Sequence, residues 1–245
     1  MVIPAYNEAS RLPAPLERLR EFARDFPSME VIVVDDGSSD RTWDIANEIA
    51  RAWSAGGPPM RVLRNPGNRG KGFSVRHGVL NASGEWILFS DADFSTPIED
   101  VHTLLDKTLQ GFDVVIGSRA LRPEFVGRHQ SALRENAGRF FNLMMRLITG
   151  LPFLDTQCGF KLMRREPARA IFSRQKIDGF GFDAEVLYLA RKLGYRSAEV
   201  PVHWNNIAGT KVSTLSGLDA FVDLARIRWW DARGRYVSSS ENLLP

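Results

Sequence analysis

Short apolar runs that favour strands alternate with segments of helical spacing through the first half of the chain. The strand-like runs cover residues 2–3, 31–34, 61–63, 86–89 and 114–116. Strands that are separated by single helices form βαβ units, in which neighbouring strands run parallel. Because the runs are almost wholly apolar, both faces of their sheet are expected to be buried. The pattern therefore predicts an α/β fold, with a mostly parallel sheet and helices on both faces.

Helical spacing fills the gaps between these runs. Expected helices cover residues 12–22, 43–53, 72–81, 135–149, 183–193 and 215–236, and a further strand covers 198–202. Thr96, Pro97 and Glu99 form a capping-box pattern, which predicts that another helix begins with Thr96 as its N-cap.

Composition narrows the class of partner. The chain has 245 residues, 44% hydrophobic and 25% charged, as in soluble proteins with one large domain or two small ones. A net charge of +3, without a compact Lys/Arg run, favours anionic small ligands or an anionic membrane surface over nucleic acid. The single cysteine, Cys158, excludes an internal disulfide and suits a reducing compartment. The longest apolar stretch, residues 140–154, contains Arg146 and is too short to span a bilayer.

Two carboxylates stand where a buried strand is expected to end. Asp91 and Asp93 follow the apolar run 86–90 and precede the expected helix start at Thr96. In an open α/β sheet, ligands bind at the carboxyl edge of the strands. Paired carboxylates at that edge can share Mg²⁺ or Mn²⁺, and the cation can hold a diphosphate. The triplet alone is weak evidence, because Asp-x-Asp is common in surface turns.

Three more loops follow expected strands and should converge on the same edge of the sheet. They cover residues 4–8, 35–40 and 68–72. Tyr6 and Asp36 are suited to flank and hydrogen-bond a base or ribose, while Lys71 or Arg69 can neutralise phosphate. Each loop also has a structural explanation. The second is a good turn followed by a helix cap, and the third lacks the full Walker pattern.

In combination, these motifs resemble the inverting family 2 glycosyltransferases, which have the Rossmann-like GT-A fold. The matching sequences are VIPAYNE at 2–8, VDDGS at 34–38, DAD at 91–93 and GSR at 117–119. Downstream, DTQCGFKL at 155–162, GFDAEVLY at 181–188, VHW at 202–204 and GTK at 209–211 are similar to polyprenyl-phosphate sugar transferases. Segments 68–72 and 155–162 resemble the dolichyl-phosphate β-glucosyltransferases more than the related dolichol-phosphate mannosyltransferases.

The resemblance implies an enzyme with a nucleotide-sugar donor. Carried over residue by residue, the donor site comprises Pro4, Tyr6, Glu8, Asp36, Lys71, Asp91, Ala92, Asp93 and Lys211. Asp91 and Asp93 are the implied ligands of a divalent cation, Mg²⁺ or Mn²⁺. Ser95 departs from the mannosyl branch, which often has a glutamine there as a further metal ligand.

The implied acceptor is a polyprenyl (dolichyl-type) phosphate. Its phosphate is already an anion near neutral pH and needs no strong general base, so the enzyme must mainly neutralise and align two anions. Arg119, Arg128 and Arg134 belong to an arginine-rich, turn-rich segment and are expected to hold this phosphate. The candidate catalytic residues are Asp93, Asp155 and Arg119. For Asp155, a place near the sugar and a structural role, as a helix cap or a partner of Arg119, are equally favoured.

The expected organisation is a catalytic domain followed by a helix. Its parts are a nucleotide-sugar-binding part at 1–118, an acceptor part at 119–214, an amphipathic helix at 215–236 and a tail at 237–245. One face of the helix carries Leu218, Phe221, Val222, Ala225 and Trp229. This face is expected either to lie on a membrane surface or to pack on the catalytic domain. The protein is accordingly expected to be cytoplasmic and peripheral at the cytoplasmic face of a membrane.

The leading hypothesis is inverting transfer of glucose from UDP-glucose to a polyprenyl phosphate, giving polyprenyl-phosphate β-glucose. Within the same class, the alternative is a GDP-mannose-dependent polyprenyl-phosphate mannosyltransferase. The alternative of another class is a degenerate nucleotide-sugar-binding or membrane-scaffold protein, and the intact pair of Asp91 and Asp93 argues against it. Sequence alone does not separate the two donors, because few side chains read the base.

Overall fold

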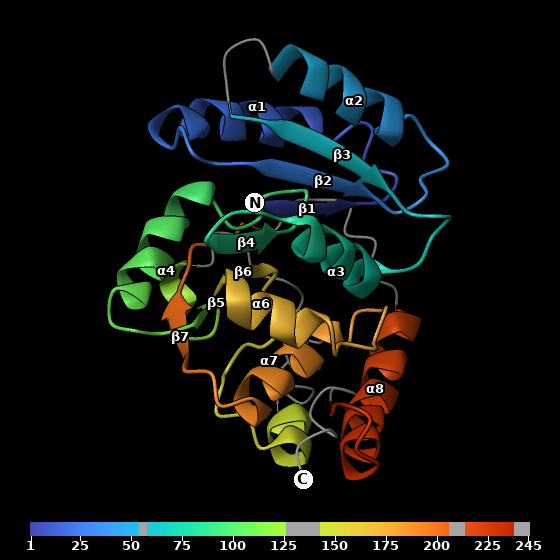
Figure 1. The fold of residues 1–245 in the computed structure, drawn as a ribbon, viewed down its shortest axis with the longest axis vertical. Helices are drawn as coiled ribbons and strands as arrows, with labels where there is room; N and C mark the ends of the chain where they lie inside the picture. Colours follow the sequence, from blue (N-terminus) through green and yellow to red (C-terminus); the bar gives the residue numbers. More distant parts are fainter. Residues whose placement is uncertain (54–57, 126–142, 206–213, 238–245) are drawn as a thin grey trace, which may run out of the picture.

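The computed structural model describes residues 1–53, 58–125, 143–205 and 214–237, except for the side chains of Pro123 and residues 214–221. The described strands form one sheet in the order β3-β2-β1-β4-β6-β5-β7 (Figure 1). They are β1 (Val2–Ala5), β2 (Val31–Asp35), β3 (Met60–Arg64), β4 (Trp86–Ser90), β5 (Val114–Ser118), β6 (Phe160–Arg164) and β7 (Ser197–Pro201). Neighbours run parallel except at β6, which is antiparallel to both β4 and β5. The predicted mostly parallel sheet is confirmed.

Helices cover both faces of the sheet, as predicted. One layer contains α1 (Pro13–Phe22), α2 (Thr42–Trp53) and α4 (Val101–Thr108), and the other contains α3 (Lys71–Asn81), α6 (Arg165–Phe172), α7 (Phe182–Lys192) and α8 (Thr214–Ala232). Successive strand residues point to opposite faces, so Val2 and Val34 join one core while Ile3 and Val33 join the other. The shorter helical pieces are η1 (Ala23–Asp25), η2 (Ile98–Asp100), η3 (Pro123–Phe125) and residues 143–149.

Two elements were not expected from the sequence. Strand β6 contains Lys161 and Arg164, and it is followed directly by α6, so it lacks the apolar pattern of a buried strand. The structure nevertheless buries Lys161 completely, and its ammonium group donates hydrogen bonds to Asp183 Oδ1 and the Cys158 carbonyl. A neutralising partner distant in sequence therefore makes this strand possible.

The predicted capping box is wrong. Pro97 is extended, with ψ of 141°, and the short turn η2 separates it from α4. Asp100, which directly precedes α4, makes no side-chain cap bond and instead accepts a hydrogen bond from the His203 backbone N–H at 2.6 Å. A tertiary contact has thus replaced the local cap. Of the helix expected at 135–149, residues 143–149 are helical and the remainder lies outside the described residues.

Helix α8 packs with a different face from the one expected to be apolar. Leu224 and Ile227 are fully buried, whereas Val222 is 50% exposed and Trp229 is 46% exposed. The helix carries apolar residues on opposite sides, so spacing alone does not decide which side packs. Within the described part of the chain, the helices are too short or too polar to cross a bilayer.

Candidate active site

The loops after β1, β2, β3 and β4 meet around one cavity of about 400 Å³ at the carboxyl edge of the sheet. The residues that line it are Pro4, Ala5, Tyr6, Glu8, Arg11, Asp36, Asn68, Gly70, Lys71, Ser74, Asp91, Ala92, Asp93 and Phe180. The structure therefore brings together every donor-site residue expected from the sequence except Lys211, which lies outside the described residues. Arg11, Ser74 and Phe180 were not expected there.

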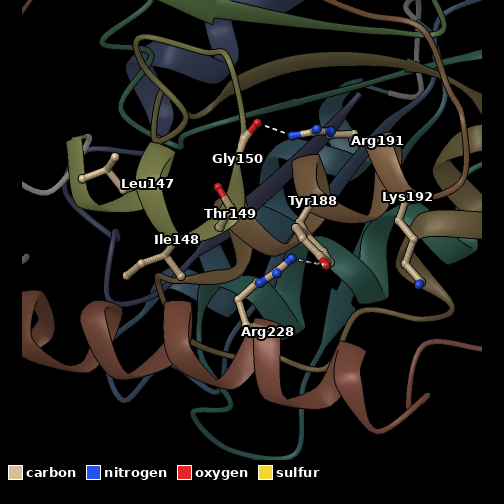
Figure 2. Close-up of a pocket in the computed structure, with 8 residues that line it drawn as sticks. All are labelled: Leu147, Ile148, Thr149, Gly150, Tyr188, Arg191, Lys192 and Arg228. Atoms are coloured by element: carbon tan, nitrogen blue, oxygen red, sulfur yellow. Dashed lines mark hydrogen bonds between the residues drawn. The ribbon is translucent and has the colours of Figure 1, made fainter.

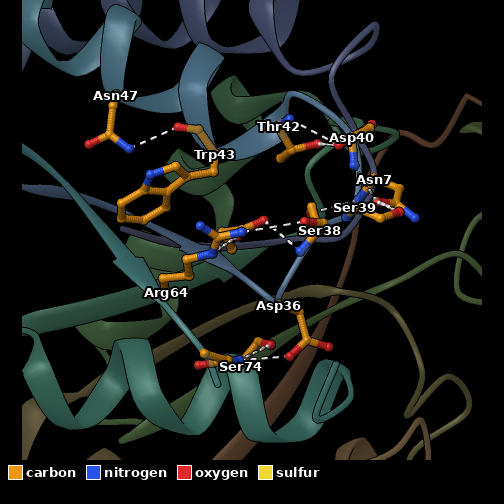
Figure 3. A network of polar contacts seen from close by, with 12 residues as sticks. Asn7, Asp36, Ser38, Ser39, Asp40, Thr42, Trp43, Asn47, Arg64 and Ser74 are labelled. Atoms are coloured by element: carbon orange, nitrogen blue, oxygen red, sulfur yellow. Dashed lines mark hydrogen bonds and ion pairs between the residues drawn. The ribbon is translucent and has the colours of Figure 1, made fainter. Parts of the chain in front are cut away.

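Asp36 fastens the third loop to the second. Its Oδ1 accepts hydrogen bonds from Asn65 Nδ2 at 2.7 Å and the Arg69 N–H at 2.9 Å, and its Oδ2 accepts one from the Gly70 N–H at 2.8 Å. Asp36 and its surroundings are drawn in Figure 3. Asn65 is buried and also donates to Ser74 Oγ at 2.9 Å, so it supports the same loop. Asn65 lies outside the sequence motifs of the site and was not expected there.

Asn7 joins the first loop to the second, as Figure 3 also shows. Its Oδ1 accepts hydrogen bonds from the backbone N–H of Ser39 at 2.9 Å and of Asp40 at 3.3 Å. Asn7 has a φ of 53°, a left-handed conformation that asparagine adopts more readily than most residues. The neighbouring Glu8 forms an ion pair with Arg11 at 2.5 Å. These contacts set the wall of the cavity beside Tyr6.

The loop that carries Asp91 and Asp93 is tightly bent. Phe94 has a φ of 49°, which is a strained conformation for a bulky residue, and Asp93 Oδ1 accepts a hydrogen bond from the Ser95 N–H at 2.9 Å. Asp91 rests against Gly159. A Cβ added at Gly159 would lie 2.3 Å from Asp91 Oδ2. Gly159 thus leaves the space that the Asp91 carboxylate occupies, which explains the glycine in the motif at 155–162.

Opposite charges are concentrated at this loop. Lys71 Nζ lies 2.6 Å from Asp91 Oδ1. Burial acts to lower the pKa of Lys71, but the carboxylates of Asp91, Asp183 and Asp93 outweigh it and raise that pKa, so the ammonium stays charged. Burial and the Asp91 charge together raise the pKa of Asp93. The two carboxylates therefore repel each other and favour a cation between them.

Asp91 and Asp93 fit a hard divalent cation. Both line the same cavity, yet within the described residues no third His, Cys, Asp or Glu completes a metal-binding group with them. Mg²⁺ commonly binds through one or two carboxylates and takes its other oxygens from substrate phosphates and water. The donor set thus suits a cation that binds together with a diphosphate.

A buried ion pair lies behind the cavity. Asp183, in the first turn of α7, accepts a hydrogen bond from Lys161 Nζ, and both side chains are almost completely buried. Burial raises the pKa of Asp183 despite this partner. The charge of Asp183 also acts on Lys71 and so links the pair to the cavity. Both residues belong to sequence motifs, but their pairing was not expected.

Arg119 and Asp155 form a bidentate ion pair. Arg119 Nε lies 2.6 Å from Asp155 Oδ2 and a terminal nitrogen lies 2.8 Å from Oδ1, while the Arg119 N–H donates to Oδ2 at 3.1 Å. Burial acts to raise the pKa of Asp155, but the Arg119 guanidinium outweighs it and holds that pKa below its usual value. Asp155 is therefore the partner of Arg119, one of the two roles expected for it. Arg128 and Arg134 lie outside the described residues.

Three comparisons with known proteins agree with this geometry. The model of "Glycosyl transferase family 2" matches residues 1–172. The chain belongs to this family and is a glycosyltransferase, as its motifs indicate.

Within the family, the chain is similar to dolichyl-phosphate beta-glucosyltransferases. It is 37% identical to that of Mus musculus over 242 residues, which cover 93% of this chain and 74% of the mouse protein. It is 32% identical to that of Saccharomyces cerevisiae over 246 residues, which cover 93% of this chain and 73% of the yeast protein. The glucosyl branch that the motifs resemble is the branch of these relatives.

Solved structures share the fold. Glucosyl-3-phosphoglycerate synthase from Mycobacterium tuberculosis, in complex with Mn²⁺, UDP and glucosyl-3-phosphoglycerate, matches with a TM-score of 0.64 at 20% identity, over 92% of this chain and 78% of that one. Mannosyl-3-phosphoglycerate synthase from Rubrobacter xylanophilus also matches with a TM-score of 0.64, at 19% identity, over 100% of this chain and 77% of that one. The GT-A type of fold implied by the motifs is confirmed.

Proposed function

We propose that this protein transfers glucose from UDP-glucose to a polyprenyl phosphate of the dolichyl type, with inversion, to give polyprenyl-phosphate β-glucose. The observation that carries the proposal is the cavity in which Tyr6, Lys71 and the pair of Asp91 and Asp93 meet. It offers an aromatic ring, a charged ammonium and a carboxylate pair within reach of one nucleoside diphosphate. The relatives of the glucosyl branch support the choice of sugar and acceptor.

In this proposal the donor lies along the cavity. Pro4, Tyr6, Glu8 and Asp36 hold the nucleoside, and Asp36 also fixes the loop at residues 68–72 beside it. Lys71 faces the diphosphate, and Lys211, which lies outside the described residues, is assigned the same role from its sequence motif alone. Ala92 is small enough to let the diphosphate approach the backbone between the two carboxylates.

Asp91 and Asp93 would hold the divalent cation, Mg²⁺ or Mn²⁺. When bound, the cation supplies positive charge that stabilises the departing nucleoside diphosphate. Lys71 adds a second positive charge from the chain itself, and its raised pKa keeps that charge present across the neutral range. The neighbour that contains Mn²⁺ and UDP supports this assignment.

The acceptor phosphate attacks the anomeric carbon from the side opposite the diphosphate, which inverts the configuration there. As an anion it needs no base, so the chain's task is to hold it in line. Arg119, Arg128 and Arg134 are proposed to neutralise it. Asp155 fixes the Arg119 guanidinium through its bidentate contact and so acts as a positioning residue beside the sugar.

The acceptor places the enzyme at a membrane, and we infer that the exposed face of α8 meets it, at the cytoplasmic side. Trp229 is 46% exposed, and its ring centroid lies 4.5 Å from the guanidinium carbon of Arg233 and 5.1 Å from that of Arg235. An exposed indole close to two cations suits the headgroup region. Residues 1–214 would then form the catalytic domain, divided near residue 118 into donor and acceptor parts, with α8 as the contact to the bilayer.

Two measurements test the proposal. Calorimetry with Mn²⁺ present should give tighter binding of UDP than of GDP, and a transfer assay in detergent should label polyprenyl phosphate from UDP-glucose but not from GDP-mannose. Stronger binding of GDP, with transfer of mannose, would reverse the assignment of the donor. Binding of UDP-glucose without transfer to any polyprenyl phosphate would instead favour a degenerate binding protein.

A further inference from the structure

A second cavity lies where α7, α8 and the helical segment 143–149 meet (Figure 2). Its volume is about 400 Å³, and it shares no lining residue with the donor cavity. Arg191 and Lys192 come from α7, Arg228 from α8, and Leu147 from the segment 143–149. None of these residues has a role in the proposed transfer reaction.

The described lining of this cavity is basic. Three cationic side chains face it and no acidic side chain does. The nearby Asp231 accepts a hydrogen bond from the Tyr188 hydroxyl and pairs with Lys192 Nζ at 2.7 Å. The charge of Asp231 thus neutralises that of Lys192, and the lining of the cavity keeps the positive charges of Arg191 and Arg228.

Both guanidinium groups are held in place by neutral oxygens. Arg228 donates to the Tyr188 hydroxyl oxygen at 3.2 Å, and Arg191 donates to the Gly150 carbonyl, as Figure 2 shows. Each uses one terminal nitrogen for this contact. A guanidinium that is already oriented loses less conformational entropy when it binds an anion, and its planar fork matches a phosphate group.

Exposed leucines stand beside this basic wall. Leu147 is 68% exposed and Leu143 is 51% exposed. Because they are four residues apart on a helical segment, they lie on the same side of it. Exposed leucines next to oriented cations are typical of surfaces that meet the boundary between lipid headgroups and acyl chains.

We propose that the cavity lined by Arg191, Lys192 and Arg228 binds the phosphate of an anionic phospholipid headgroup, with Leu143 and Leu147 entering the acyl boundary beside it. This inference rests on the proposed function, because the polyprenyl acceptor places the enzyme at a bilayer. The bound lipid is a docking lipid and not the acceptor, since the acceptor phosphate must reach the separate donor cavity. The contact would fix how the catalytic domain sits on the membrane.

Sedimentation with vesicles of phosphatidylcholine, with or without phosphatidylglycerol as the anionic lipid, tests the proposal. The double variant Arg191→Gln/Arg228→Gln should bind the anionic vesicles about thirtyfold more weakly, since each well-placed cation contributes ~1 kcal/mol near such a surface and the pair therefore ~2 kcal/mol. Arg24→Gln/Arg51→Gln is the matched control: it removes the same charge from exposed positions at η1 and α2 and should change binding less than about twofold. Leu143→Ser/Leu147→Ser should weaken binding to both kinds of vesicle.

Several outcomes would overturn the inference. One is equal loss of vesicle binding in the matched control, and another is undiminished binding by the Arg191/Arg228 variant. Competition by inorganic phosphate beyond that of chloride at equal ionic strength would show a site for free phosphate rather than lipid. Transfer in detergent should be unchanged in the Arg191/Arg228 variant. Failure of transfer by the wild type would refute the proposed function and leave the vesicle result to be judged separately.

Discussion

Lys71 Nζ and Asp91 Oδ1 lie 2.6 Å apart, so the cation of α3 occupies an oxygen that a divalent metal would also need. Lys71 lies close enough to the cavity to turn instead toward a diphosphate. We therefore expect a bound diphosphate to draw Lys71 away from Asp91, which would link the binding of metal to the binding of donor.

Lys71→Met should therefore have opposite effects on two ligands. Removal of the competing ammonium should strengthen Mn²⁺ binding in the absence of nucleotide, while UDP should bind about tenfold or more weakly, since a charge-assisted hydrogen bond contributes ~1.5–3 kcal/mol. Calorimetric titrations of each ligand alone and in the presence of the other measure both effects. Lys107→Met, on α4, is the control. Equal weakening of Mn²⁺ and UDP would contradict the competition.

Gly159→Ala should damage the metal site without unfolding the protein. The new Cβ would stand 2.3 Å from Asp91 Oδ2, and the carboxylate must move to relieve this contact. We expect at least about tenfold weaker Mn²⁺ binding in the presence of UDP, equivalent to ~1.4 kcal/mol. Gly179→Ala is the matched control, because a Cβ there would meet nothing within 4 Å. Unchanged Mn²⁺ affinity in Gly159→Ala would show that Asp91 needs no such space.

Asp93→Asn should abolish transfer and yet stabilise the fold. The folded-state pKa of Asp93 is raised, by burial and then by Asp91, so its ionised form costs stability once the pH exceeds the unfolded-state value of about 3.9. The neutral amide removes that cost, and Tm at pH 7.5 should rise by about 2–4 °C for each kcal/mol gained. Transfer should fall more than about a hundredfold, because loss of a residue that only supports a metal ligand already costs about 10–100-fold. Full activity of the variant in excess EDTA would disprove the metal role.

Asp155→Asn should destabilise the protein at neutral pH. Removal of the buried partner from this bidentate ion pair should cost about 1.5–3 kcal/mol, because the Arg119 guanidinium, whose side chain is 32% exposed, loses its charged hydrogen-bond partner. The folded-state pKa of Asp155 is lowered, so its contribution is present above its unfolded-state pKa of about 3.9 and is lost as the pH falls through the folded-state pKa. In urea unfolding, the free energy of unfolding should be clearly lower for the variant than for wild type at pH 7, and this difference should narrow at acid pH.

Glu99→Gln is the control for this measurement. It breaks the exposed ion pair with Arg18, whose two side chains are 55% and 49% exposed, and should cost less than about 1 kcal/mol. If Asp155→Asn lowered the free energy of unfolding no more than this control does, the bidentate pair would contribute little to stability.

Local pattern predicted most of the sheet but failed where a partner is distant in sequence. The strands at residues 31–34 and 86–89 are uniformly apolar, so their own composition predicts that they are buried. Strand β6 could not be recognised because Lys161 is buried only by virtue of Asp183, which is 22 positions further along the chain. The prediction of a cap at Thr96 was wrong for a similar reason. The helix begins after Asp100, whose carboxylate accepts a hydrogen bond from His203, a residue distant in sequence.

The site was predictable to the extent that parallel strands end together. The four loops were expected to converge because their strands are parallel, and the cavity joins them. The motifs did not indicate that Asp36 would use both oxygens on the third loop, or that Gly159 would make room for Asp91. Such roles depend on contacts between segments that are distant in sequence, and these contacts exist only in the folded chain.

Trp229→Ala should weaken membrane binding without loss of stability. Trp229 is 46% exposed on the outer face of α8, while Leu224 and Ile227 fill the core from the other face, so truncation of the indole leaves the packed side intact. Removal of the whole helix would instead uncover that core. Sedimentation should show weaker binding to both neutral and anionic vesicles, because an interfacial indole acts mainly through its apolar area and hydrogen bonding.

The matched control is Trp230→Ala. Trp230 is partly buried against the core and packs edge-on against Tyr236, with ring centroids 6.4 Å apart. Its loss should lower the unfolding free energy by about 3 kcal/mol, as large-to-small changes in a core do, while the exposed indole keeps its membrane contact. If Trp229→Ala bound vesicles as well as wild type while Trp230→Ala did not, the membrane contact would belong to another face of the helix. Trp229 lies on the exposed face of α8 and Trp230 on the packed face, so this pair of neighbours separates membrane contact from packing on the core.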